Sequence, residues 1–323
     1  MTMRFADIVG HEDVRAELLR AADRGRVPHA LLFHGPEGVG KRSMALAFFS
    51  YLSCRERTGQ DSCGQCVACR QVTEKTFPDL SVLAPEKGTI KIDAVRGAMP
   101  RLLFPPIVGP WKFLLIDDAH ALTLEAANAA LKTLEEPPSQ TLFVLVTSTP
   151  DVLPRTVLSR CLAMPFGPVL ARDIVSMLVA RGVDPEKARA AAAMARGSPG
   201  AAVRLLHSPV EEERTAFVAA FLNLLGSSVE ARMQFADGVA SERKEGLIAL
   251  LESVVHDVLA ATAGVDDSAL RNPDLAGLIR TFAEKVGQDR AIRMAEVMLE
   301  WDANRRYSPS IRVAVDRLVL EIP

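Results

Sequence analysis

The stretch Gly35–Ser43, GPEGVGKRS, has residue types that can bind nucleotide phosphates. Its glycines permit a tight loop with inward-pointing backbone N–H groups: Gly35, Gly38 and Gly40. Lys41 supplies a positive charge for the β- and γ-phosphates. The pattern asks for a hydroxyl directly after the lysine to hold Mg²⁺, and this chain has Arg42 there. Ser43 comes one position late, roughly 100° further round a helix, so the loop predicts either an altered phosphate site or a glycine turn with no ligand.

Two acids follow an apolar run in FLLIDDAH, Phe113–His120. A strand that ends in acids is how a phosphate-loop ATPase supplies a carboxylate for Mg²⁺ and a second carboxylate that activates water. Asp117 fits the first role. Asp118 stands where a glutamate is expected and is one methylene shorter, and a misplacement of about an ångström can cost on the order of a hundredfold in rate. The alternative is a pair of solvated acids at a strand end.

Four of the five cysteines lie within sixteen residues, with the spacing x8, x2 and x2: Cys54, Cys63, Cys66 and Cys69. In a reducing cytosol such a cluster indicates a metal site rather than disulfides. Four thiolates match the tetrahedral shell of a structural zinc ion and leave no position for water. The alternative is four free cysteines that are close by chance. Cys161 stands apart, as a small packing residue.

The elements that must position these residues alternate between strands and helices. Apolar runs predict buried strands at Ala30–Phe33, Phe113–Ile116 and 141–149, and the segment 42–54 has helical spacing. A further helix starts after Thr123, a plausible N-cap, and stops before two prolines. This order predicts an α/β fold with a mainly parallel, three-layer sheet.

The character of the chain changes after about residue 165. A short helix opens at Asp184 and Pro185, and helices alone are expected from about residue 209. We therefore predict three domains: 1–165, with the cysteine module at 54–69, a small helical domain at 166–207, and an all-helical domain at 208–323. With 323 residues and a formal net charge of −2, the chain is no highly basic DNA-wrapping protein. Without a signal-like N-terminus or a run of about 20 apolar residues, a cytoplasmic protein with no membrane span is expected.

Four motifs occur in the order GPEGVGK, FLLIDDAH, ALKTLEEPP and LSRC. In this order they resemble the clamp-loader branch of the AAA+ ATPases over about residues 5–206. The resemblance implies an AAA+ phosphate-loop sheet with an inserted four-cysteine zinc module, a helical lid and a helical collar that joins subunits. It also implies that Arg160, in LSRC, is an arginine finger that reaches the γ-phosphate bound by a neighbouring subunit.

Three positions depart from the motor subunits of that branch. Arg42 replaces the magnesium hydroxyl, Asp118 replaces the glutamate, and Gly200 stands where motor subunits carry a nucleotide-sensing arginine. Arg160 is retained. This combination resembles a non-motor subunit that helps its neighbour to hydrolyse ATP and has no ATPase activity of its own. Because Lys41 is retained, passive binding of ATP or ADP stays open.

The resemblance thus predicts a subunit of the bacterial clamp loader, which loads the sliding clamp onto primed DNA. Its expected partners are the motor ATPase subunits, a clamp-opening subunit, the sliding clamp and primed DNA within the complex. One alternative is an active motor ATPase of the same complex, which the three departures disfavour. Another is a stand-alone phosphate-loop regulator, which LSRC and the cysteine module disfavour.

Overall fold

The computed structural model describes residues 4–86, 88–207, 210–241, 245–303 and 311–323. They form two compact units, Met1–Met177 with Gly197–Ala201, and Leu178–Arg196 with Ala202–Pro323. The first unit carries the motifs described above. The second is helical. The finer division into three domains stays a prediction.

The first unit is built on a five-stranded parallel sheet with the order β2-β3-β4-β1-β5. Its strands are β1 (Ala30–His34), β2 (Leu80–Leu83), β3 (Lys112–Ile116), β4 (Thr141–Thr147) and β5 (Leu162–Pro165). The three central strands, β3, β4 and β1, are the ones that the sequence predicts. The edge strands β2 and β5 are partly exposed and lack the long apolar run that identifies a buried strand.

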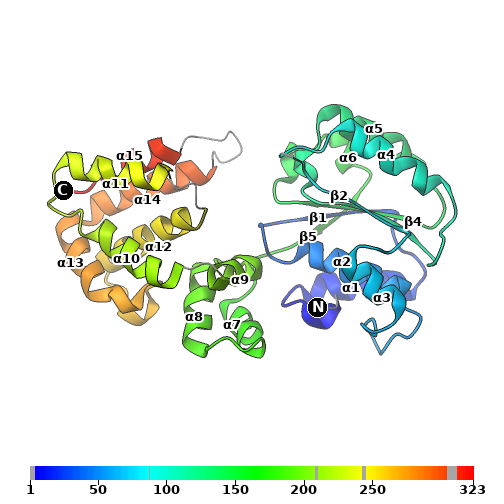
Figure 1. Ribbon diagram of the computed structural model, residues 1–323, viewed down its shortest axis with the longest axis horizontal. Coiled ribbons are helices and arrows are strands. Elements are labelled where there is room, and N and C mark those ends of the chain that lie inside the picture. Colours follow the sequence, from blue (N-terminus) through cyan, green and yellow to red (C-terminus); the bar gives the residue numbers. More distant parts are fainter. Residues whose placement is uncertain (1–3, 87, 208–209, 242–244, 304–310) are drawn as a thin grey trace. The chain divides into compact units, whose positions relative to one another are not determined.

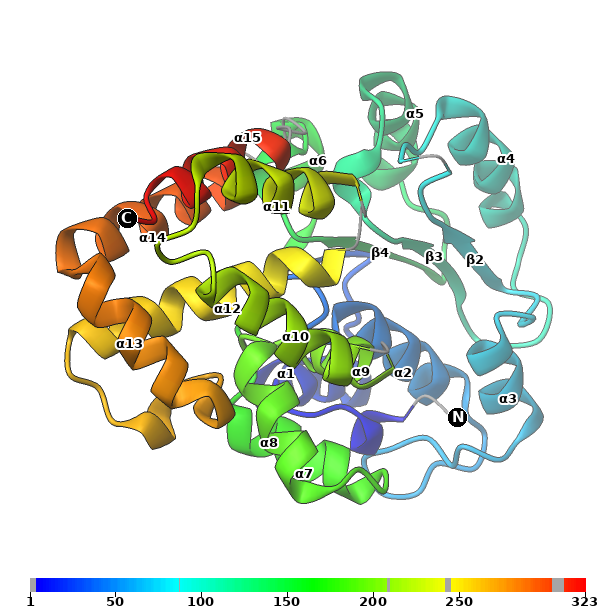
Figure 2. The same cartoon turned by 60° about the vertical axis from the view of Figure 1, so that its left-hand side comes forward.

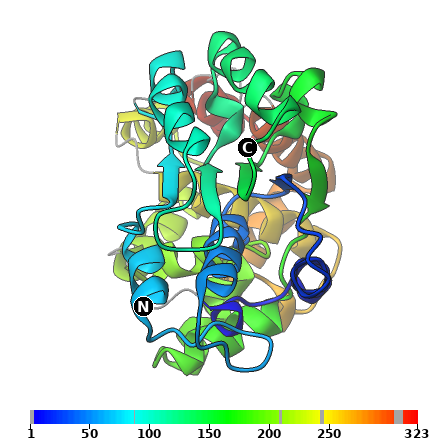
Figure 3. The ribbon, with the colours of Figure 1, turned by 90° about the vertical axis from the view of Figure 1, so that its right-hand side faces the viewer.

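Helices cover both faces of the sheet. Successive strand residues point to opposite faces, and both sets are apolar here, so each face needs a helical cover. One face packs on α1 (Glu12–Asp23), α2 (Lys41–Ser53) and α3 (Val67–Glu74), and the other on α4 (Ile92–Leu103), α5 (Leu124–Glu135) and α6 (Arg155–Leu158). In β1, Leu31 and Phe33 enter the first core, while Ala30 and Leu32 enter the second. Figures 1 and 3 show the two helical layers, and the three-layer α/β prediction is confirmed.

Two predicted helix starts have the expected caps. Thr123 accepts a hydrogen bond from the backbone N–H of Ala126 at 3.2 Å and opens α5. Asp184 accepts from the N–H groups of Glu186 and Lys187 and opens α8 (Pro185–Met194). Two further helices, α7 (Ala171–Ala180) and α9 (Pro199–His207), flank α8 in the sequence.

The second unit is completed by helices that share one apolar core. Figure 2 shows the course of these helices. They are α10 (Val210–Leu222), α11 (Val229–Ser241), α12 (Glu245–Thr262), α13 (Ala276–Val286), α14 (Gln288–Ala303) and α15 (Ile311–Leu320). A buried carboxylate fixes the turn before α13, since Asp257 accepts from the N–H groups of Arg271 and Asn272 at 2.8 Å each. The expected all-helical region is found in the described part of this unit. No described helix is long and apolar enough to span a bilayer.

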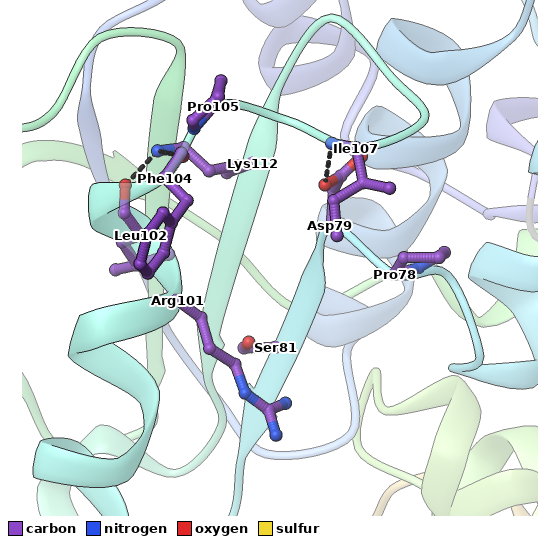
Figure 4. Close-up of a pocket in the computed structure, with 9 residues that line it drawn as sticks. All are labelled: Pro78, Asp79, Ser81, Arg101, Leu102, Phe104, Pro105, Ile107 and Lys112. Carbon is purple, nitrogen blue, oxygen red and sulfur yellow. Dashed lines mark hydrogen bonds between the residues drawn. The ribbon is translucent and has the colours of Figure 1, made fainter.

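A cavity of about 330 Å³ lies at the amino ends of β2 and β3, where Asp79 and Lys112 line it (Figure 4). Asp79 accepts hydrogen bonds from the N–H groups of Ile107, Val108 and Gly109, at 2.7 to 3.0 Å. The buried Lys112 amino group donates to the carbonyls of Leu102 and Phe104. Both charges therefore hold the turn between α4 and β3. This cavity lies at the opposite end of the parallel strands from the loop that follows β1.

Candidate functional site

The glycine loop lies between β1 and α2, at the carboxyl edge of the sheet. Its three glycines have the φ angles that favour glycine, +141° at Gly35, +71° at Gly38 and +112° at Gly40. A Cβ at Gly35 would lie only 2.0 Å from the carbonyl oxygen of Phe166. The loop thus makes tight turns that depend on its glycines, as a phosphate loop requires, and α2 begins at Lys41.

Lys41 is turned back onto the loop. Its side chain is buried, and Nζ donates to the carbonyl oxygens of Gly35 at 2.7 Å and Pro36 at 2.6 Å. Burial lowers the pKa of Lys41, and the nearby Asp118 carboxylate opposes that shift. The ammonium group is therefore satisfied by the loop itself.

Arg42 is paired with the first of the two acids. Its Nη1 lies 2.6 Å from Oδ2 of Asp117, the residue directly after β3. Burial raises the pKa of Asp117, and the Arg42 charge opposes this shift. The guanidinium thus supplies the positive charge next to the carboxylate that would hold Mg²⁺ in an active site.

Asp118, the second acid, differs from Asp117 in its surroundings. It is exposed and adopts a left-handed backbone, with φ +49°, at the start of a short turn of 3-10 helix, Ala119–Ala121. Close by, the buried Thr147 at the end of β4 has its Oγ1 3.3 Å from Nδ1 of His120. Asp117, Asp118 and Thr147 therefore meet at the carboxyl edge, as parallel strands require.

The start of α9 lies directly on the glycine loop. The N–H of Gly200 donates to the carbonyl oxygen of Gly38 at 2.9 Å. A Cβ at Gly200 would lie 3.0 Å from that oxygen, and a Cβ at Gly38 would lie 2.4 Å from Oγ of Ser198. A side chain at position 200 would therefore push against the loop, so the glycine allows this close contact.

Arg160 lies in the turn after α6, and its contacts are not with the glycine loop or with the two acids. Its Nη1 donates to the carbonyl oxygen of Thr156 at 2.8 Å and to Oγ of Ser159 at 3.1 Å. Its Nη2 lies 2.5 Å from Oε1 of Glu135, the last residue of α5. No local pattern marks Glu135 as functional, although two glutamates at the end of a helix are an unusual signal.

The four clustered cysteines come together as the sequence predicts: Cys54, Cys63, Cys66 and Cys69. Their Sγ atoms lie within 4.8 Å of one another. Three separations are 3.5, 4.0 and 4.0 Å, and four sulfurs at about 2.3 Å from a tetrahedral zinc ion are roughly 3.8 Å apart. The donor set and the spacing therefore fit a closed metal site.

The protein backbone also favours thiolates in this cluster. The N–H groups of Cys66 and Gln65 donate to Sγ of Cys63 and lower its pKa to about 7. Burial raises the pKa of Cys54 and of Cys69. A bound metal ion would overcome that burial, because it deprotonates the thiols that coordinate it.

The cysteine module also holds the start of the chain. Asp61, within the module, accepts hydrogen bonds from the N–H groups of Phe5 at 3.0 Å and Ala6 at 2.9 Å. Phe5 is buried, and its ring centroid lies 5.8 Å from that of Tyr51 in α2. The module therefore connects α2, α3 and the residues before α1.

Comparison with known proteins assigns the family. The family model described as "DNA polymerase III, delta subunit" matches residues 10–169. DNA polymerase III subunit delta' of Escherichia coli K12 is 32% identical over 277 residues, which cover 85% of this chain and 82% of that protein. The delta' subunit of Yersinia pestis is 32% identical over 314 residues, 94% of this chain and 90% of that protein. The chain belongs to the delta' family of DNA polymerase III.

The first part of the chain is also similar to a longer protein. DNA polymerase III subunit tau of Escherichia coli K12 is 40% identical over 158 residues, which cover 49% of this chain and 24% of tau. The chain thus spans about a quarter of the length of that relative. Membership of the delta' family agrees with the predicted clamp-loader subunit, and the motor alternative is not better supported.

Removing the Arg42 guanidinium is expected to expose a magnesium site. With serine at position 42, Asp117 loses its internal counterion and a hydroxyl returns to its place after Lys41. ATP binding to Arg42→Ser should then be at least about tenfold tighter with Mg²⁺ than with EDTA, which corresponds to about 1.4 kcal/mol.

The measurement is a titration of each purified protein with a fluorescent ATP analogue. The unchanged chain and Ser43→Ala serve as controls, and neither should respond to Mg²⁺. Equal affinities of Arg42→Ser with and without the metal would contradict the assignment of Arg42 as the replacement for it.

Proposed function

We propose that this chain is a non-motor subunit of the bacterial DNA polymerase III clamp loader, which hydrolyses no ATP itself and helps to load the sliding clamp onto primed DNA. The observation that carries the proposal is the ion pair between Arg42 and Asp117. It places a protein cation where an active ATPase needs Mg²⁺ to bridge the β- and γ-phosphates. The family membership of the chain supports the same conclusion.

The proposed contribution of the subunit is Arg160, acting in trans on ATP bound by a neighbouring ATPase subunit. Arginine fingers stabilise the charge that builds up on the transferred phosphoryl group. Arg160 has a partly exposed side chain and is anchored on its own turn through Thr156 and Ser159. Both features fit a group that is presented to another chain.

The partners that follow from this role are the motor ATPase subunits, the clamp-opening subunit, the sliding clamp and primed DNA within the assembled complex. The helical second unit fits a collar that joins subunits. The proposed location of the protein is the cytoplasm. This role does not require ATP or ADP in the glycine loop, because Arg160 acts on nucleotide bound by another subunit. Lys41 and Arg42 already have partners within the chain.

We further propose that the four-cysteine cluster binds zinc in a structural role. All four ligands come from one segment, Cys54–Cys69, and they leave no position for a substrate. The residues that would hold the ion also fix the connection between α2 and α3. The metal supplies no chemistry to the nucleotide loop in this proposal.

Steady-state ATP hydrolysis by the purified chain tests the central claim. We expect no turnover above the background given by the Lys41→Ala variant, because the metal-side carboxylate is paired with Arg42. Mg²⁺-dependent turnover that the Lys41 change abolishes would overturn the proposal and favour the active motor subunit.

A further inference from the structure

Glu135 and Arg160 form an ion pair that joins two of the sequence motifs. Oε1 of Glu135, in ALKTLEEPP, lies 2.5 Å from Nη2 of Arg160, in LSRC. The two residues are 25 positions apart, and both belong to the sheet-containing unit. The other terminal nitrogen of the guanidinium is bonded within its own turn, to Thr156 and Ser159. Arg160 is therefore held from two directions by separate elements.

The stability of α5 does not explain a glutamate at this position. Glu135 is the last residue of α5, and Glu136 follows as its C-cap. The carboxyl end of a helix carries partial negative charge, which disfavours carboxylates there. The ion pair is also solvent-exposed, with the Glu135 side chain 48% and the Arg160 side chain 32% accessible, and exposed pairs contribute little to folding.

We infer that Glu135 is a positioning residue for Arg160: its carboxylate fixes the guanidinium in the orientation that the neighbouring subunit's ATP requires. This inference rests on the proposed action of Arg160 in trans. Glu135 touches neither phosphate nor water in this account, and it acts only through the arginine.

The physical reason is the loss of side-chain freedom. A free arginine samples many rotamers, and ordering it costs free energy when it meets the phosphate. A guanidinium presents five N–H donors in one plane. The contacts to Thr156, Ser159 and Glu135 engage the Nη1 and Nη2 groups and fix the plane, and the remaining donors can meet phosphate oxygens. A group that is already oriented stabilises the transition state without this ordering cost.

The test uses the complete reconstituted clamp loader with primed DNA, and compares Glu135→Gln with the matched control Glu136→Gln. Glu136 is exposed and forms no ion pair within the part of the chain that the structure describes. Glutamine keeps the size of the side chain and removes the charge. Arg160→Ala and the double variant Glu135→Gln/Arg160→Ala complete the set, and thermal unfolding of each purified subunit checks that the variants fold.

We expect Glu135→Gln to lower the kcat for ATP at the site that faces Arg160 about twofold to fivefold, the range of an exposed ion pair. The KM for ATP should stay unchanged, because Arg160 contributes in the transition state. Glu136→Gln should behave as the unchanged protein, and the double variant should be no slower than Arg160→Ala alone.

The outcomes separate the two claims. If Arg160→Ala does not change turnover, the proposed function fails and the inference fails with it. If Arg160→Ala slows turnover but Glu135→Gln matches Glu136→Gln, the inference alone is overturned. A faster Glu135→Gln complex would show that the carboxylate competes with the phosphate, and further slowing in the double variant would show an effect that bypasses Arg160. Either result also overturns the positioning role.

Discussion

Replacing Arg160 with alanine is expected to slow hydrolysis of the ATP bound by the neighbouring subunit by about 10³-fold or more, the usual contribution of an arginine finger. The side chain is partly exposed and its contacts within the chain are to a helix end and to its own turn. Its removal should therefore leave the fold and the assembly of the complex intact. The ATP hydrolysis rate of the whole complex should then fall by the amount that this one site contributes.

Rapid-quench measurement of a single ATP turnover in the assembled complex separates this site from the others. The ATP bound at the site that faces Arg160 should react slowly in the variant, while the ATP at the other sites reacts at the normal rate. Arg155→Ala is the matched control, since Arg155 is an exposed arginine in α6, the short helix just before the turn that carries Arg160. Unchanged burst amplitude and rate for Arg160→Ala, with assembly verified by gel filtration, would remove the finger assignment.

Removal of the proposed zinc ion is expected to unfold the cysteine module while the sheet persists. Zinc binding by small peptides has an apparent free energy of about 10–16 kcal/mol, so its loss exceeds what this short segment can recover from its own packing. The thiols of Cys54 and Cys69 are buried, and without a metal the cluster holds four unlinked cysteines. Hydrogen exchange should accelerate by at least about a hundredfold across residues 54–75 and at the backbone N–H groups of Phe5 and Ala6, which donate to Asp61.

Elemental analysis should find one zinc per purified chain, and Cys66→Ser should lower that content. Cys161→Ser is the control, because Cys161 lies outside the cluster and packs beside the apolar core under α5. A metal-free preparation with unchanged exchange protection across the module would rule out a structural zinc ion.

Local signals identify the centre of the sheet and fail at its edges. Phe113–Ile116 is apolar at every position because both faces of β3 are covered. Leu162–Pro165, at the edge, exposes three of its four residues and has no comparable pattern. The cap at Thr123 is likewise readable, since it depends on residues three positions apart.

The candidate site likewise combines features that a local sequence pattern predicts with contacts that only the fold reveals. The glycine loop, the acids after β3 and the cysteine spacing are local patterns, and the structure places them as their elements require. The pairs Arg42–Asp117 and Glu135–Arg160 join positions 75 and 25 residues apart. No single segment contains such a pair. The sequence shows that Arg42 breaks the motif, and only the fold shows which group it meets.

The pair between Arg42 and Asp117 also bears on timing. A motor subunit gains and loses a metal ion and a phosphate in every cycle, so the charge at this corner of its sheet alternates. Here the counterion is the side chain of Arg42, which pairs with Asp117 within the same chain, so no ligand has to bind or leave to balance that charge. In the proposed non-motor role, this corner of the sheet therefore needs no exchange of metal and phosphate, and the subunit can keep one conformation while its neighbours bind and release nucleotide.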